Sequence, residues 1–138
     1  MALIDPHFFI TPEGWCEGIA RSPCENFDAR PEQTVIDLLV IHNISLPPEE
    51  YGGSYIEDLF ANRLDCDAHP YFEKLRDLKV SAHFLIKRDG SAHQFVATQH
   101  RAWHAGASEF KGRARCNDFS IGIELEGSDL DRKSTRLN

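Results

Sequence analysis

The sequence lacks the features that define several large classes of protein. It has no apolar run approaching the roughly 20 residues that a membrane-spanning helix requires. Its formal net charge of -7 argues against a nucleic-acid-binding surface. It also begins without a basic segment and a sustained apolar stretch, so we expect no secretory signal and no membrane partner.

Closely spaced cysteine pairs are absent as well. The four cysteines are scattered along the chain as Cys16, Cys24, Cys66 and Cys116. Structural zinc sites commonly use closely spaced pairs, so a zinc site built from these cysteines is not favoured. Without a secretory signal, reduced thiols are favoured over a disulfide framework. At 138 residues and 41% hydrophobic, the chain is long enough for one domain with a real core.

Two apolar segments predict strands that present reactive side chains. Residues 35–42 form an apolar run that ends on His42, directly before a proline-rich loop, which is typical of a buried strand. Residues 119–126 alternate so that Glu124 and Glu126 share one face of a second strand. A histidine and a glutamate presented at strand ends are components of hydrolytic metal sites.

The remaining pattern predicts a hairpin and short helices. Residues 80–97 resemble two strands joined by a turn at residues 89–90. Ser54 is expected to cap a short helix with Glu57 as its capping-box partner, and Pro70 suits the first turn of another helix. Strands that alternate with short helices favour an α/β or α+β fold. The helix side chains expected to face the core are Ile56, Leu59, Phe60, Phe72 and Leu75.

Three parts of the chain are expected to differ in character. Residues 1–34 contain four prolines and few periodic positions, so we expect an irregular N-terminal arm. Residues 35–130 are expected to hold the domain, in which the polar stretch 99–118 is long enough to be functional or lid-like. Residues 131–138 resemble the in-frame translation of a common sequencing adapter, so we expect a non-native tail and an interrupted natural protein.

His42 and Glu124 each have an ordinary explanation when taken alone. A histidine after an apolar strand is more often a packed or hydrogen-bonded core residue, although neutral imidazole is the commonest metal ligand. Glu124 could be solvated or paired with an arginine instead of catalytic, since a raised pKa requires burial. Its neighbour Glu126 also leaves a paired-carboxylate glycosidase open.

The loop around Trp103 holds further candidates. Trp103 and His104 could form an apolar wall for a sugar or peptide, although Trp103 could equally anchor the loop to the core. His83 and His104 are possible metal ligands, but no HxH or HExxH spacing supports them. Arg113 and Arg115 could bind a substrate carboxylate through paired hydrogen bonds, or remain solvated loop charges.

Four segments together are more specific than any single residue. They are VIHNISLPP (40–48), SAHFLI (81–86), RAWHAG (101–106) and RCNDFSIGIELEG (115–127). In this order they closely resemble the AmpD-type 1,6-anhydro-N-acetylmuramyl-L-alanine amidases of Gram-negative cell-wall recycling. The resemblance implies a mixed central sheet with flanking helices, as in peptidoglycan-recognition proteins. It also implies a cytoplasmic enzyme, monomeric at full length, that acts on small-molecule anhydromuropeptides.

The resemblance implies a role for each matching position. His42 matches the first of the family's three zinc ligands, and Glu124 matches the acidic residue that assists the zinc-bound water. Lys79 stands where an arginine is frequent in the substrate cleft. The positions that match residues lining the cleft or lying just behind it are Trp103, Arg115, Lys79, Asn43 and His83.

No segment matches the family's second histidine ligand, its aspartate ligand or the lysine that supports the developing oxyanion. The resemblance places all three in a C-terminal segment. We therefore expect an incomplete Zn²⁺ site, no useful amidase activity, and aggregation through an apolar sheet face left uncovered. The main alternative is a non-catalytic peptidoglycan-fragment binding module of the same fold, and a secreted or phage lytic amidase is a second.

Overall fold

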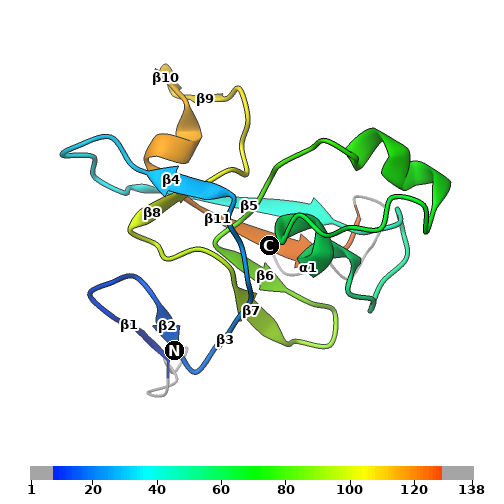
Figure 1. The fold of residues 1–138 in the computed structure, drawn as a ribbon. Helices are drawn as coiled ribbons and strands as arrows, with labels where there is room; N and C mark the ends of the chain where they lie inside the picture. Colours follow the sequence, from blue (N-terminus) through cyan, green and yellow to red (C-terminus); the bar gives the residue numbers. More distant parts are fainter. Residues whose placement is uncertain (1–7, 129–138) are drawn as a thin grey trace.

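The computed structural model describes residues 8–128 and is organised around a five-stranded sheet (Figure 1). In spatial order the strands are β3 (Ala20–Arg21), β7 (Ala92–Gln94), β6 (Phe84–Ile86), β11 (Ser120–Glu126) and β5 (Leu38–Ile44). β11 is parallel to both β5 and β6, whereas β6 and β7 form an antiparallel hairpin. The mixed sheet and the few helices confirm the predicted α+β fold.

β5 and β11 are the long strands that position the candidate site. They pair in parallel along their whole length, from Ser120 opposite Leu38 to Glu126 opposite Ile44. β5 therefore begins later than predicted and continues beyond His42, because the pairing with β11 extends past it. His42 lies within the strand, and the prediction that it ends the strand was wrong.

The helices are short and bury the expected side chains. They are α1 (Tyr55–Phe60), the 3₁₀-helix η1 (Pro70–Leu75) and the 3₁₀-helix η2 (Cys116–Asp118). α1 buries Ile56, Leu59 and Phe60, and η1 buries Phe72, as predicted. The predicted capping box does not form, because the backbone of Ser54 has φ -103° and ψ 8° instead of an extended conformation.

The predicted hairpin is present but its strands are shorter than expected. Gly90 has φ +88° at the turn, and the Lys87 N–H donates to Ser91 O at 2.8 Å. Leu85 is fully buried and Ile86 is 37% exposed, as alternation requires. Residues 81–83 lie outside β6 and are all buried, so alternation does not apply to them.

The segment before β5 is more regular than the expected arm. Asn26 is 1% exposed, and its amide donates to Val80 O at 2.9 Å and to Asn62 Oδ1 at 2.8 Å. These contacts fix the segment to the core through residues distant in sequence, which local composition does not reveal. Three further strand pairs are β1 (Phe9–Ile10) with β2 (Cys16–Glu17), β4 (Phe27–Ala29) with β8 (His100–Ala102), and β9 (Glu109–Phe110) with β10 (Arg113–Ala114).

The expected non-native tail at residues 131–138 lies outside the described residues. Within residues 8–128, no helix has the length and apolar character to cross a membrane.

The two faces of the central sheet are buried unequally. The even-numbered residues of β11, which include Glu124, are buried, and its odd-numbered apolar residues are only half-buried. On β5, Leu39 and Ile41 are 55% and 51% exposed. The hydrophobic core lies on the same side as Leu85, against α1 and η1. The buried face of β11 is thus its polar face, which places reactive side chains where water is scarce.

Candidate active site

Glu124 is a buried carboxyl group without a protein partner for one of its oxygens. It lies in the middle of the central strand β11 and is 8% exposed. Within residues 8–128 its Oε2 atom accepts no hydrogen bond. Burial raises the pKa of Glu124 to about 8, because the charged form loses its hydration. A carboxyl group with a pKa near neutrality can both accept and return a proton at physiological pH.

Glu126, two residues further along the same face, has a different role. Its carboxylate accepts hydrogen bonds from the Gly52 N–H at 2.9 Å and the Arg88 N–H at 3.1 Å. These bonds tie the loop before α1 and the β6–β7 hairpin to the end of β11. Both Glu126 oxygens are thus used in the fold, which disfavours a paired-carboxylate glycosidase.

His42 lies beside Glu124 on the neighbouring strand. The two residues are register partners in the parallel β5–β11 pair, so their side chains project from the same face. His42 is half-buried, and burial lowers its pKa, which keeps the imidazole neutral at pH 7. A neutral imidazole is the form that binds a metal ion or accepts a proton.

His104, in the loop after β8, approaches His42 closely. Nδ1 of His104 is 3.0 Å from Nε2 of His42, and its Nε2 is 3.0 Å from Oγ of Ser120. Its ring lies against Gly122, where an added Cβ would be 2.4 Å from His104 Cγ. Burial lowers the pKa of His104 to about 3, so it is neutral as well. The sequence offered His104 as a possible metal ligand or as part of an apolar wall with Trp103, and its contact with His42 was not predicted. Gly122, which faces the ring from β11, was the signal that could have located it.

His83 is fully buried and does not line a cleft. Its Nδ1 accepts a hydrogen bond from the Gly122 N–H at 3.0 Å, so the neutral ring carries its proton on Nε2. That proton is donated to His100 O at 2.9 Å, and burial lowers the pKa of His83 to about 4. His83 was predicted to line the cleft or lie just behind it, and its full burial favours the second position. It supports the backbone of β11 from behind the site.

Arg30 is a residue that the sequence analysis missed. Its guanidinium group donates to four backbone carbonyls, those of Thr98, Asn117, Asp118 and Ser120, at 2.8 to 3.2 Å. These bonds fix the start of β11 to the loop before β8. Because the partners lie 68 to 90 residues along the chain, no local signal could have identified Arg30.

Three further predicted site residues, Trp103, Arg115 and Asn43, differ in burial and in the face of the sheet they occupy. Trp103 is half-buried, and its backbone N–H donates to Ser81 Oγ at 3.0 Å. The Arg115 side chain is 79% exposed and 3.5 Å from Asp118. Asn43 is adjacent to His42 on β5 and therefore faces the other side of the sheet, so a shared substrate site is not supported.

Lys79 lies apart from this group. It lines a hollow of about 470 Å³ beside α1 and η1. Neither His42 nor Glu124 lines that hollow, so the structure does not bring Lys79 together with them.

The sequence that places His42 and Glu124 on one sheet face also matches a known protein family. Residues 32–136 match the family described as N-acetylmuramoyl-L-alanine amidase. The chain belongs to this amidase family.

Two curated amidases are close in sequence. The 1,6-anhydro-N-acetylmuramyl-L-alanine amidase AmpD of Escherichia coli is 55% identical over 120 residues, covering 87% of this chain and 66% of that protein. AmpD of Haemophilus influenzae is 57% identical over 104 residues, covering 75% of this chain and 56% of that protein. The chain thus spans just under two thirds of the first relative and just over half of the second.

Solved structures of AmpD share the fold of this chain. A crystal structure of a selenomethionine AmpD derivative matches with a TM-score of 0.85 and 50% identity, covering 94% of this chain and 74% of that chain. The solution structure of Citrobacter freundii AmpD matches with a TM-score of 0.57 and 50% identity, covering 94% and 71% of the two chains. The fold implied by the resemblance is confirmed.

The described part of the chain does not form a complete metal site. Among residues 8–128, no group of three or more histidine, cysteine, aspartate or glutamate side chains is placed to hold a metal ion. The neutral imidazole of His42 is the right type of donor for zinc, but catalytic zinc requires three protein ligands. The donor type fits the expected Zn²⁺, and the number of donors does not.

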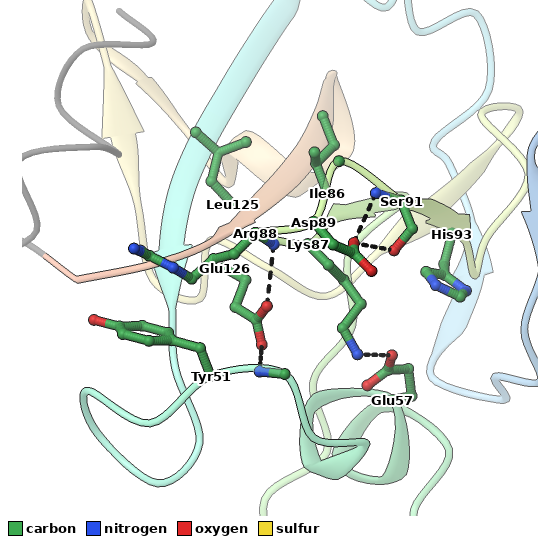
Figure 2. Close-up of a pocket in the computed structure, with 12 residues that line it drawn as sticks. Tyr51, Glu57, Ile86, Lys87, Arg88, Asp89, Ser91, His93, Leu125 and Glu126 are labelled. Carbon is green, nitrogen blue, oxygen red and sulfur yellow. Dashed lines mark hydrogen bonds and ion pairs between the residues drawn. The ribbon is translucent and has the colours of Figure 1, made fainter.

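A larger cavity of about 880 Å³ lies near the end of β11, between the β6–β7 hairpin and the loop before α1 (Figure 2). Three of its ionic groups are occupied within the fold, since Lys87 contacts Glu57 at 2.8 Å and Glu126 accepts two backbone hydrogen bonds. Neither His42 nor Glu124 lines this cavity. This cavity is therefore separate from the candidate site on the sheet face around these two residues.

Proposed function

We propose that the protein in its complete form is a zinc-dependent N-acetylmuramoyl-L-alanine amidase of cytoplasmic cell-wall recycling. It hydrolyses the amide between the lactyl group of 1,6-anhydromuramic acid and L-alanine in anhydromuropeptides. Membership of the amidase family supports the reaction, and the names of the AmpD relatives support the substrate.

One observation in the structure supports this function most directly: Glu124 has a buried, unpartnered carboxyl oxygen on the same face as His42. As general base, Glu124 accepts a proton from water while the water oxygen attacks the amide carbonyl. It then returns a proton to the L-alanine nitrogen as the C–N bond breaks. The pKa of about 8 belongs to the metal-free chain, in which Glu124 is mostly protonated at pH 7. A Zn²⁺ ion held beside it would favour the charged carboxylate and so lower that pKa to the range a general base needs.

Two other residues belong to this proposal as substrate contacts. The half-buried indole of Trp103 offers an apolar wall, and the exposed guanidinium of Arg115 can hold a peptide carboxylate. Lys79 is left out because it lines a separate hollow, and Asn43 because it faces the other side of the sheet. His83 is left out because it is fully buried.

The 138-residue chain alone is expected to show no useful hydrolysis. His42 is the one zinc ligand proposed within residues 8–128, and a single imidazole in water does not hold zinc tightly. The remaining donors come, on this proposal, from outside residues 8–128.

The test joins this chain to the part of Escherichia coli AmpD that it does not match. Anhydromuropeptide hydrolysis is then measured for the chain alone and for the joined protein, with Zn²⁺ and with a chelator. We expect zinc-dependent cleavage by the joined protein, and Glu124→Gln should lower its kcat by about 10²-fold or more. Glu126→Gln is the matched control, since it changes a buried carboxylate of the same strand. It should lower the free energy of unfolding and change kcat much less than Glu124→Gln does.

Two outcomes would contradict the proposal. Robust cleavage by the 138-residue chain alone would show that the zinc site is not incomplete. Binding of anhydromuropeptide without cleavage by the joined protein would favour the non-catalytic binding module instead.

A further inference from the structure

The ring of His42 contacts a second imidazole, that of His104. Nε2 of His42 and Nδ1 of His104 are 3.0 Å apart, and the rings meet edge to face with centroids 5.2 Å apart and an interplanar angle of 70°. We propose that His104 is a positioning residue that holds His42 through its Nε2 atom, fixes its tautomer and leaves Nδ1 as the nitrogen that meets a reacting partner. The reactive use of Nδ1 rests on the proposed function, whereas the positioning of His42 does not.

His104 can position another residue because it is itself held on several sides. Its Nε2 lies 3.0 Å from Ser120 Oγ, and its backbone N–H donates to Asn117 Oδ1 at 3.2 Å. Its ring packs on Gly122, at a distance that leaves no room for a Cβ atom. The ring plane of His104 is therefore set by β11 and by the loop that precedes it.

The contact with His42 also fixes where protons lie. A hydrogen bond between two neutral imidazoles needs one N–H donor and one nitrogen without a proton. If Nδ1 of His104 carries a proton, Nε2 of His42 accepts the hydrogen bond. If Nδ1 of His104 carries no proton, Nε2 of His42 donates it. Nδ1 of His42 can bind a metal ion or accept a proton only when it carries no proton itself. The proposal therefore requires the second direction, in which Nε2–H of His42 donates to Nδ1 of His104 and Nε2–H of His104 donates to Ser120 Oγ. The second nitrogen of an imidazole commonly sets the first nitrogen's chemistry in this way.

The test reads the tautomer of His42 directly in the metal-free 138-residue chain. Long-range ¹H–¹⁵N NMR spectra of the protein labelled with ¹⁵N-histidine distinguish Nδ1–H from Nε2–H rings. They are recorded at about pH 7.5, above the ordinary histidine pKa of about 6.5. We expect the Nε2–H tautomer of His42 alone in the wild type, and a mixture of both tautomers in His104→Leu, which removes the partner nitrogen. A wild-type His42 that carries its proton on Nδ1 would overturn the proposal.

Two further variants separate positioning from packing. His104→Asn restores a polar group near the position of Nδ1, so it should restore a single His42 tautomer. His93→Asn removes a half-buried imidazole elsewhere, 3.4 Å from Ser22 Oγ, and should leave His42 unchanged. An unchanged tautomer in folded His104→Leu, or equal effects of His104→Leu and His104→Asn, would overturn the proposal.

If His104→Leu does not fold, Ser120→Ala decides the question. This variant keeps the imidazole of His104 and removes the hydroxyl that anchors its Nε2. A second His42 tautomer in Ser120→Ala would support positioning, and an unchanged spectrum would overturn it. Because this measurement needs no catalysis, an inactive joined protein with a fixed His42 would contradict the amidase proposal and leave the positioning role standing.

Discussion

Glu124 and His42 are register partners on adjacent parallel strands, which places a carboxyl group and an imidazole side by side on the buried face of β11. Within residues 8–128, neither group forms an ion pair that would explain its burial: His42 contacts the neutral His104, and Glu124 Oε2 has no partner. A buried carboxyl group without a partner costs stability. Such a cost is expected where a proton has to move during catalysis.

The first prediction concerns how the stability of the protein depends on pH. Burial raises the pKa of Glu124 from 4.5 to about 8, so between these values the native state keeps a proton that the unfolded chain has lost. Unfolding then releases a proton, and the free energy of unfolding falls by up to about 1.4 kcal/mol per pH unit as pH rises through this window. Glu124→Gln removes this loss. The free energy of unfolding of the variant should therefore rise relative to that of the wild type by about 2–3 kcal/mol between pH 6 and 8. Urea denaturation at several pH values measures the difference.

The histidines impose the opposite dependence on the acid side. Burial lowers the pKa values of His83 and His104 from 6.5 to about 4 and about 3, so unfolding takes up protons below pH 6.5. Stability is then lost as pH falls, and in the wild type these two groups outweigh Glu124. The wild type should be most stable near pH 6.5. Glu124→Gln should still lose stability as pH falls below 6.5, but it should no longer lose stability as pH rises above 6.5.

An exposed carboxylate provides the control for this experiment. A hydrogen bond and ion pair with Arg76 lower the pKa of Glu73, so Glu73→Gln should lose stability relative to the wild type only above the acid range. That difference has the opposite sign to the one expected for Glu124→Gln. Equal pH profiles of wild type and Glu124→Gln would show that Glu124 is not a buried, protonated group.

The second prediction concerns the close packing of Gly122 and His104. An alanine Cβ at position 122 would meet His104 Cγ at 2.4 Å, so Gly122→Ala must displace the ring. Overpacking of this kind costs about 1–3 kcal/mol, which urea denaturation can measure. The displacement should also break the 3.0 Å contact between His104 and His42, which NMR can detect through the His42 ring signals.

Gly53→Ala is the matched control for Gly122→Ala. The nearest side-chain atom to a Cβ at position 53 is 3.8 Å away, on Tyr55, and the residue is exposed. This substitution should change stability by less than about 0.5 kcal/mol. If both alanine variants have the same stability, His104 does not depend on the space above Gly122.

Local sequence patterns predicted the elements of the fold better than their exact extent. The apolar run ending near His42 and the alternation around Glu124 predicted the two strands that form the site, because burial and period-2 alternation are local properties. The capping box at Ser54 was wrong, since the loop before α1 is held by Glu126 from β11 and does not adopt the extended cap conformation. Long-range contacts override a local preference in that case.

The candidate site was predicted in part for the same reason. His42 and Glu124 belong to strands and could be located by pattern, and the family resemblance assigned their roles. The position of His104 depends on a loop that Asn117 and Arg30 hold in place through partners remote in sequence. The fully buried state of His83 likewise follows from tertiary packing that no single segment encodes.

The third prediction concerns self-association through the exposed face of β5. β5 is an edge strand of the five-stranded sheet, and it carries Leu39 and Ile41 at 55% and 51% exposure. An edge strand with exposed apolar side chains is a template for pairing with another chain. Ile41→Lys should therefore reduce concentration-dependent association, as measured by analytical ultracentrifugation or light scattering, without lowering the unfolding midpoint.

Val35→Lys is the control, because Val35 is 70% exposed but precedes the strand, and it should leave association unchanged. If Ile41→Lys and the wild type associate equally, the exposed face of β5 does not mediate the contact.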